Sequence, residues 1–459
     1  MVNIEKLRKI TGDDWVVTDR DKMQDYMRDA VFDAVLPSPA ENVILVKPAN
    51  SVEISDILKL ANEDQFPVVV RGGGSGLSGG AIPTIDCVLL SLERFNKIEE
   101  VDRNSLMITA QAGVSYAELV NAAEDAGMFF PPKPGDAGAA VGGIVACNAA
   151  GARAIKYGVT RNFVKGLEVV LPTGEIINLG GKLIKNAMGI DLLHLMIGSE
   201  GALGVITKAV FRMIPKPRYS ALLLASFTER LKAIEVSAVV ASQMIIPLAA
   251  EYMDHDLVDM TAKYLGAEWP AKNGKAHLFF ISTGETEEEV YSQLEDIARI
   301  CEQNGAIDVL MAETKAEQDN IIRIRGEIAT AQKSAGTVGD FMDICVPPAN
   351  LPALFQSILD IENKYSTTIP VTGHSLDGNL HPTPLKELAD RGLLEQVKEE
   401  IYAETIRLGG VLTGEHGLGT IRLHNTPLWP DTGIWTLMTK IKRTFDPNNI
   451  LNPYRVFPD

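Results

Sequence analysis

The sequence predicts an α+β protein with more than one domain. Between about residues 43 and 311, short β-branched runs alternate with amphipathic helical stretches, as expected for sheets covered by helices. A length of 459 residues suits about two to four domains. Two prolines in three residues, at Pro215-Lys216-Pro217, interrupt any regular element and mark the best domain boundary.

The bulk properties are those of an ordinary folded chain, with 46% hydrophobic and 22% charged residues. A formal charge of −17 argues against nucleic acid as a partner, because binding phosphates needs clustered Lys and Arg. No signal-like or membrane-spanning apolar run is seen, so we expect a cytoplasmic protein. The cysteines form no C-x-x-C motif, so we expect neither disulfides nor an iron–sulfur cluster; they are Cys87, Cys147, Cys301 and Cys345.

The first part of the chain follows the order strand, helix, strand, glycine loop. Ser51 is a candidate N-cap for the helix in this series. The expected elements are helices over 4–10 and 21–28, a strand over 43–46, a helix with apolar residues at 54, 57, 58 and 60, a β-branched run over 68–70, and a strand over 87–92.

The loop Arg71–Thr84 consists mainly of glycine and serine with one arginine. Glycines let backbone N–H groups converge closely on an anion, and Arg71 and two serine hydroxyls add donors. We interpret the loop as a phosphate cradle, with a ligand-free structural turn as the alternative. Gly74–Gly79 also matches the nicotinamide fingerprint G-x-G-x-x-G. That fingerprint requires a following helix, whereas a strand-like run follows here, so we reject a nicotinamide site.

A strand over 107–110 and a helix over 116–126 lead into a glycine-rich region. Residues 131–204 hold 14 of the 39 glycines. The small residues of Gly142–Gly151 would let a flat ligand pack against backbone, although a tightly packed helix would look similar. A hairpin is expected over 164–179, with its turn at Pro172–Gly174, and the region closes on Gly198–Thr207.

Beyond the boundary, the pattern predicts helices on one face of an antiparallel sheet. The expected strands cover 221–225, 248–252, 276–282 and 307–311, and the expected helices cover 228–243, a stretch after 252, and 287–304.

Three histidines lie in motifs that suggest chemistry. His374 and His381 flank Asp377-Gly378-Asn379, a strong hairpin turn signal, so a hairpin would bring the two imidazoles together on adjacent strands. A strand running into glycines over Gly410–Gly419 carries Glu415 and His416 side by side. Two His nitrogens and one Glu oxygen form a metal site with open positions. Unrelated buried histidines, or a metal site without catalysis, are the alternatives.

These motifs, with the tail Phe445–Pro453, resemble in order those of the FAD-linked 2-hydroxy acid dehydrogenases. This group contains D-lactate dehydrogenases, glycolate oxidase flavin subunits and D-2-hydroxyglutarate dehydrogenases. The resemblance covers nearly the whole chain. It implies a p-cresol methylhydroxylase-type FAD-binding domain over 1–215, an antiparallel-sheet-and-helix substrate domain over 216–410, and a C-terminal segment over 411–459 that returns to the FAD domain.

The resemblance also assigns residues. His374, His381 and Glu415 would bind a divalent metal, which could be Fe²⁺, Zn²⁺ or Mn²⁺, and His416 would be the catalytic base. Arg325, Asn379 and Thr383 would contact the substrate. The residues implied for FAD are Arg71, Gly72, Gly73, Gly74, Ser75, Gly76, Leu77, Ser78, Pro134, Asp136, Gly142, Gly143, Asn148, Gly151, Tyr157, Gly158, Glu200, Gly201, Val205, Ile206 and Asn452.

The implied chemistry is oxidation of a metal-chelated 2-hydroxy acid, with proton transfer to His416 and hydride transfer to flavin N5. Two departures from the family pattern, Phe341 and Ala329, favour a small monocarboxylate such as D-lactate over a dicarboxylate. The chain is most similar to lactate dehydrogenase subunits that reduce an electron-transferring flavoprotein, with a quinone or iron–sulfur subunit as the alternative acceptor. A flavin-free metal hydrolase and a non-catalytic flavoprotein are the rival classes.

Overall fold

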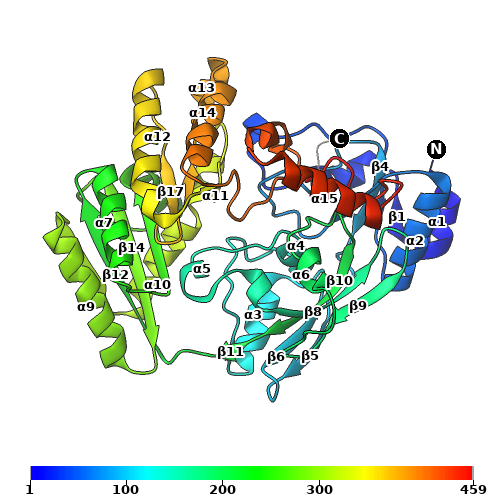
Figure 1. Ribbon diagram of the computed structural model, residues 1–459, viewed down its shortest axis with the longest axis horizontal. Helices are drawn as coiled ribbons and strands as arrows, with labels where there is room; N and C mark the ends of the chain where they lie inside the picture. The colour runs from blue at the N-terminus through cyan, green and yellow to red at the C-terminus, as the bar shows by residue number, and fades with distance from the viewer. Residues whose placement is uncertain (1, 457–459) are drawn as a thin grey trace.

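The computed structural model describes residues 2–456 and shows two lobes side by side (Figure 1). The first lobe contains both chain ends and three sheets, and the second lobe contains one large sheet with helices. On this arrangement we propose 1–215 and 216–410 as domains, with 411–459 returning to the first.

The first lobe begins with a four-stranded sheet in the order β1-β2-β4-β3, in which β2, β4 and β3 are parallel. Asn50, not the predicted Ser51, caps α2, because the Asn50 side chain accepts a hydrogen bond from the Glu53 N–H. The segment predicted as a helix over 21–28 is a 3-10 helix over Arg20–Met27. The other elements are α1 (Ile4–Thr11), β1 (Val16–Val17), β2 (Val43–Val46), α2 (Ser51–Asp64), β3 (Val68–Arg71) and β4 (Cys87–Ser91).

A five-stranded antiparallel sheet follows, in the order β5-β6-β10-β8-β9. It includes the predicted hairpin, which is formed by β8 and β9. The small-residue run contains a short helix, α4, rather than a continuous one. The elements are β5 (Ile98–Asp102), β6 (Met107–Gln111), α3 (Tyr116–Asp125), α4 (Val141–Ala146), α5 (Ala154–Tyr157), β8 (Val164–Val170), β9 (Ile176–Gly180), α6 (Leu192–Met196) and β10 (Val205–Arg212).

A two-stranded pair, β7 (Met128–Phe129) with β11 (Ile214–Pro215), precedes the crossing into the second lobe. The seven-stranded sheet there has the order β15-β12-β14-β13-β17-β18-β16, and its described ladders are all antiparallel. Its strands are β12 (Tyr219–Phe227), β13 (Ala249–Asp254), β14 (Ala276–Gly284), β15 (Asp308–Ala312), β16 (Ile344–Cys345), β17 (Val371–His374) and β18 (Asn379–Pro382).

Helices cover both faces of this sheet, so the prediction of helices on one face was wrong. In β12, Leu223 packs into the core formed with α7, α9, α12 and α14, whereas its neighbour Leu224 packs with α8 and α10. Every residue of Ala221–Phe227 is buried, which is expected of a strand covered twice. The helices are α7 (Arg230–Ser242), α8 (His255–Leu265), α9 (Glu287–Gln303), α10 (Lys315–Gly326), α11 (Ile328–Ala335), α12 (Leu351–Tyr365), α13 (Lys386–Asp390) and α14 (Leu394–Arg407).

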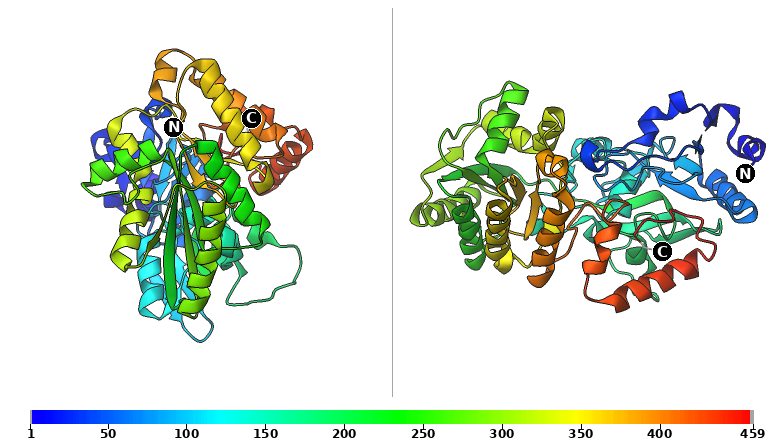
Figure 2. Two further views of the ribbon diagram at one scale, coloured as in Figure 1. Left: turned by 90° about the vertical axis from the view of Figure 1, so that its left-hand side faces the viewer. Right: turned by 90° about the horizontal axis from the view of Figure 1, so that it is seen from above.

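After α14 the chain returns to the first lobe (Figures 1 and 2). The strand predicted within Gly410–Gly419 is instead two isolated bridges, in which Val411 pairs with Cys345 and Thr413 with Asp343. Helix α15 (Thr432–Phe445) then lies along the first lobe, and Leu451 bridges to Val68 of β3.

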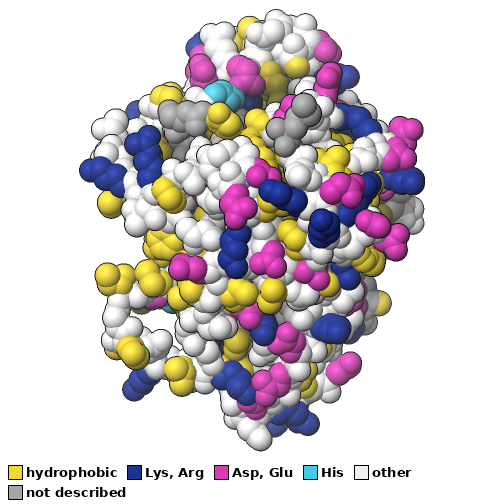
Figure 3. All heavy atoms as spheres, turned by 90° about the vertical axis from the view of Figure 1, so that its right-hand side faces the viewer, with side chains coloured by type: hydrophobic (Ala, Val, Ile, Leu, Met, Phe, Trp, Pro, Cys, Tyr) yellow, Lys and Arg dark blue, Asp and Glu magenta, His cyan; other side chains and the backbone are white. Residues whose placement is uncertain are grey.

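Acidic and basic side chains intersperse on the outer face of the first lobe (Figure 3). Within residues 2–456, no helix combines the length and apolar content needed to cross a membrane. The four cysteines are free thiols.

Candidate active site

A cavity of about 950 Å³ lies between the glycine loops of the first lobe and the sheet of the second lobe. On one side it is lined by the loop Gly72–Ser78 that follows β3, and on the other by side chains of β13, α10, α11 and the β17–β18 hairpin. A cavity of this size suits a cofactor and a small substrate together.

Close packing and backbone conformation require glycine at two positions of the first loop, Gly73 and Gly74. A Cβ on Gly73 would lie 2.8 Å from the Gly138 carbonyl oxygen, and Gly74 has a φ of +69°. Arg71, predicted to contact FAD, does not line the cavity. Its guanidinium donates to the carbonyls of Asp25 and Arg28, so it holds the N-terminal segment against the loop.

Most of the other residues predicted to contact FAD line the cavity; they are Pro134, Asp136, Gly142, Gly143, Gly151, Glu200, Gly201, Val205, Ile206 and Asn452. Three do not. The Asn148 side chain accepts from the Arg161 N–H, Tyr157 packs on Phe129, and Gly158, with a φ of +82°, ends α5. We therefore assign these three to the backbone and packing beside the cavity.

Glu200 connects the first lobe to the segment that follows His416. Its carboxylate accepts the backbone N–H groups of Leu418 and Gly419, each at 2.8 Å. Gly417 has a φ of +80°, and a Cβ there would lie 2.8 Å from the Glu200 carboxyl carbon. The turn after His416 therefore needs both the glycine and the carboxylate.

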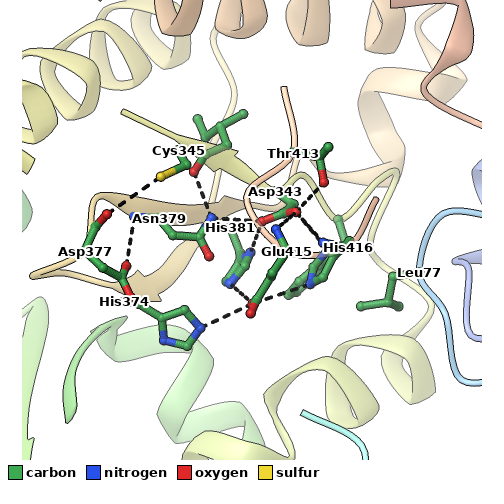
Figure 4. A network of polar contacts seen from close by, with 12 residues as sticks. Leu77, Asp343, Cys345, His374, Asp377, Asn379, His381, Thr413, Glu415 and His416 are labelled. Atoms are coloured by element: carbon green, nitrogen blue, oxygen red, sulfur yellow. Dashed lines mark hydrogen bonds and ion pairs between the residues drawn. The ribbon is translucent and has the colours of Figure 1, made fainter. Parts of the chain in front are cut away.

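The hairpin forms as predicted and carries two histidines into the cavity. The imidazoles of His374 and His381 lie 5.4 Å apart between ring centres. The Nε2 atoms of His374 and His381 each lie 3.3 Å from Glu415 Oε1, and that of His416 lies 3.8 Å from the same oxygen (Figure 4). We call His374, His381, Glu415 and His416 the histidine cluster.

Asp343, which the sequence did not single out, lies behind the histidine cluster. Its carboxylate is fully buried and faces the Nδ1 atoms of His381 and His416 at 3.7 and 3.8 Å. It also accepts the backbone N–H groups of Glu415 and His416 and the Thr413 hydroxyl. Asp343 therefore fixes the bend that lets Glu415 and His416 face one site.

Neither Asn379 nor Thr383, predicted as substrate contacts, lines the cavity. Asn379 donates its side-chain amide to Asp343 Oδ1 at 2.8 Å and to the Ile344 carbonyl. Thr383 donates to the Pro370 carbonyl and accepts from Gln332. Both residues support the hairpin.

Burial and neighbouring charges shift the pKa values of the groups in the histidine cluster. Burial would lower the pKa of His374, but Glu251 and Glu415 hold it well above its usual value. Burial lowers the pKa of His416 to about 4, although Asp343 opposes this. Glu415 stays ionised, because His374 and His381 outweigh the effect of burial and lower its pKa.

Two further features shape the cavity. Arg325 lines it as predicted, and its Nη2 lies 2.8 Å from Glu251 Oε2. Lys133, a residue that sequence reasoning missed, also lines it; burial and Arg153 lower its pKa to about 8. Phe341 also lines the cavity and stacks on His381 at 5.3 Å and on Phe32 at 5.7 Å between ring centres, which gives an apolar wall.

Comparison with known proteins identifies the family. Residues 216–456 match the C-terminal domain of FAD-linked oxidases, and residues 43–180 match an FAD-binding domain. A D-lactate dehydrogenase of Archaeoglobus fulgidus is 41% identical across 94% of this chain and 95% of the relative. The chain belongs to the FAD-linked oxidase family.

Other relatives place this FAD-linked oxidase among the 2-hydroxy acid dehydrogenases, as its motifs indicated. The glycolate oxidase subunit GlcD of Bacillus subtilis is 35% identical, covering 90% of this chain and 88% of its own. A probable mitochondrial D-2-hydroxyglutarate dehydrogenase of Oryza sativa subsp. indica is 30% identical, covering 99% and 82%.

Solved structures confirm the predicted fold of this FAD-linked oxidase. A 4-ethylphenol oxidase from Gulosibacter chungangensis superposes with a TM-score of 0.79 at 18% identity, covering 99% of this chain and 97% of that one. A p-cresol methylhydroxylase superposes with a TM-score of 0.77 at 17% identity, covering 98% and 95%. The two-lobed α+β architecture is therefore of the p-cresol methylhydroxylase type.

Proposed function

We propose that this FAD-linked 2-hydroxy acid dehydrogenase oxidises D-lactate to pyruvate, uses one divalent metal ion, and passes electrons to an electron-transferring flavoprotein. The observation that carries the proposal is the convergence of three imidazole Nε2 atoms on one carboxylate oxygen. This occurs in the same cavity as the glycine loop. The D-lactate dehydrogenase relative supports the choice of substrate.

His374, His381 and Glu415 are the residues that would hold the metal. Their nitrogen and oxygen donors suit zinc, manganese or iron. The contact between His374 Nδ1 and Glu251 Oε1, at 2.5 Å, turns His374 Nε2 toward the cavity.

A second set of potential ligands, Asp343, His381, Glu415 and His416, has one atom each within 4.8 Å of the others. We favour the set with His374, because Asp343 faces the Nδ1 side of the histidines. Its oxygens already accept hydrogen bonds from the backbone of Glu415 and His416.

When bound, the metal supplies a Lewis acid and FAD supplies a two-electron acceptor. His416 remains outside the preferred ligand set, and its Nε2 would accept the proton of the substrate hydroxyl. Arg325 would bind the substrate carboxylate. Arg325 lines the cavity with 17% of its side chain exposed, so the part of its guanidinium that does not contact Glu251 can donate to an anion.

The apolar wall supports a small monocarboxylate. Phe341 and Ala329 line the cavity and pack with Phe32, so the wall offers no charge to a second carboxylate. One observation favours 2-hydroxyglutarate as a second candidate, because Lys133 adds a cation to Arg325 in the same cavity.

Anaerobic titration of the purified flavoprotein decides the substrate. D-Lactate should bleach the flavin absorbance near 450 nm at lower concentration than L-lactate, glycolate, malate or D-2-hydroxyglutarate. A preference for D-2-hydroxyglutarate would replace the D-lactate proposal, and a yellow protein that none of these acids bleaches would end it. Metal analysis of the same preparation should find about one divalent ion per chain, and a chelator should abolish the bleaching.

The electron acceptor is tested separately. Similarity of the motifs to lactate dehydrogenase subunits that use an electron-transferring flavoprotein supports that partner, and a quinone or iron–sulfur subunit is the alternative. Mixing the enzyme, D-lactate and purified electron-transferring flavoprotein should reduce the latter. Reduction of a quinone analogue without reduction of the flavoprotein would reject this partner.

A further inference from the structure

Glu251 is a buried carboxylate that contacts two different parts of the active site. It lies on β13, directly opposite His374 of β17 in the sheet register, and lines the cavity. Only 1% of the residue is exposed. Its Oε1 lies 2.5 Å from His374 Nδ1, and its Oε2 lies 2.8 Å from Arg325 Nη2.

Such a carboxylate is costly to bury unless both oxygens have partners. Here each oxygen has one partner, and the two partners come from different elements. His374 belongs to the hairpin that would hold the metal, whereas Arg325 ends α10 and would bind the substrate. Glu251 therefore bridges the two through its one carboxylate, and it lies on β13, whose neighbours β14 and β17 restrict its movement.

Both contacts leave free the atoms that would bind the metal and the substrate. Accepting the Nδ1–H of His374 turns Nε2 toward Glu415 and the cavity, and a metal ion that displaced the Nε2 proton would bind the lone pair there. Holding Arg325 by Nη2 leaves the rest of its guanidinium free, and the side chain, 17% exposed, lines the cavity where an anion could bind it. The Glu251 carboxylate thus orients both the proposed metal ligand His374 and the proposed substrate-binding group Arg325.

We propose that Glu251 is a positioning residue that sets the separation between the metal site and Arg325, so that one 2-hydroxy acid can engage both. The inference rests on the proposed function, since it assigns roles to His374 and Arg325. It predicts that the affinities for metal and for substrate fall together when Glu251 is changed, although Glu251 itself touches neither.

The test uses the holoenzyme of Glu251→Gln. The amide keeps the size of the side chain but cannot accept from both His374 and Arg325. We expect the FAD spectrum to be retained, the affinity for Zn²⁺ or Mn²⁺ to fall about 10- to 100-fold, and the KM for D-lactate to rise by a similar factor. Metal affinity is measured by equilibrium dialysis of the chelator-treated protein, which is a readout independent of turnover.

Asp254→Asn is the matched control. Asp254 lies three residues further along the same strand, is also buried, and is paired with Arg230 rather than with the cavity. This variant should lose thermal stability but retain the wild-type metal affinity and KM. If Glu251→Gln matches Asp254→Asn, with lower stability and unchanged affinities, Glu251 is merely structural and the proposal is wrong.

Glu251→Asp covers the case in which the Gln variant does not fold. Aspartate keeps both acceptors but draws them back toward β13, so it should fold and show a smaller loss of both affinities. A Glu251→Asp variant with wild-type affinities for both metal and D-lactate would contradict the proposal that Glu251 sets the separation of the two sites. Failure of the proposed function looks different, because the wild-type protein itself would then neither bind metal nor be reduced by any 2-hydroxy acid.

Discussion

Asp343 supports the histidine cluster from the side away from the cavity. One oxygen of its carboxylate accepts hydrogen bonds from the backbone N–H groups of two consecutive cluster residues, Glu415 and His416. His381 and His416 stack with ring centres 5.1 Å apart, and both turn their Nδ1 atoms toward the same carboxylate. Both imidazoles therefore turn Nε2 away from Asp343 and toward Glu415 Oε1, where His381 would bind the proposed metal and His416 would accept the substrate proton.

His416→Asn should separate binding from chemistry. The variant removes the proposed proton acceptor but none of the proposed metal ligands, so FAD and metal should remain at wild-type levels. Flavin reduction by D-lactate should slow about 10²- to 10⁴-fold in stopped-flow measurements. His194, which is half-buried and outside the cavity, provides the control His194→Asn. Wild-type reduction rates in His416→Asn would remove His416 from the mechanism.

Lys133 predicts how substrate affinity depends on pH. Because the pKa of Lys133 is lowered to about 8, its ammonium is charged at pH 7 and neutral at pH 9. The KM for D-lactate should therefore rise as the pH increases through about 8. In Lys133→Met the KM for D-lactate should be about tenfold higher than in the wild type at pH 7, and the rise in KM near pH 8 should be absent.

Lys156→Met is the control for this pH effect. Lys156 also has a lowered pKa, caused by burial, but it donates to Thr283 outside the cavity. A KM step that persists in Lys133→Met would mean that another group titrates.

At the scale of elements, the hairpin was predictable and its supports were not. The turn signal and both histidines lie within eleven residues, so local sequence determines how they meet. Asp343 and Glu251 have no neighbouring motif, and only the register of β13, β16 and β17 brings them to the histidines. Helices on both faces of the large sheet were missed because a doubly covered strand such as β12 shows no alternation.

A substitution at Gly378, in the turn between β17 and β18, tests whether the hairpin positions both histidines. It has a φ of +85°, and a Cβ there would overlap the Val346 carbonyl oxygen. Gly378→Ala should displace His374 and His381 together, costing roughly 1–3 kcal/mol of stability from backbone strain plus the overlap. Metal content should fall while FAD is retained.

Gly392→Ala provides the control for Gly378→Ala. Its φ of +69° causes similar strain, but the added Cβ meets nothing within 4 Å. Its metal content should stay normal while thermal stability drops slightly. Equal metal loss in both alanine variants would show that the strain, and not the hairpin position, is responsible.

At the scale of the molecule, the active site is shared by segments that are far apart in the chain. The first lobe contributes the glycine loops, the second contributes the hairpin and Arg325, and the returning C-terminal segment contributes Glu415, His416 and Asn452. The order of motifs allowed the returning segment to be predicted. The position of the cavity depends on how the lobes pack, for which Lys333 of α11 supplies one direct link by donating to the carbonyls of Ala30 and Val31.

Asn452 tests whether the returning segment holds the cofactor. Its side chain accepts from the Val70 N–H at 2.8 Å and donates to the Glu200 carbonyl, so it joins the two glycine segments at the cavity. Asn452→Ala should weaken FAD binding about tenfold, seen as a lower ratio of absorbance at 450 to 280 nm after dialysis, because two buried hydrogen bonds are lost. Metal content should not change, since the histidine cluster is untouched.

The control for Asn452→Ala is Asn448→Ala. Asn448 lies in the same segment but donates to Asn62 at the surface, so its variant should keep FAD like the wild type. If both variants retain FAD equally, the returning segment contributes to the fold but not to FAD binding. The affinity for FAD must then come from the loops of residues 72–78 and 142–151. If Asn452→Ala loses metal as well as FAD, the two lobes are coupled through this segment, because Glu200 connects Asn452 to the backbone that follows His416.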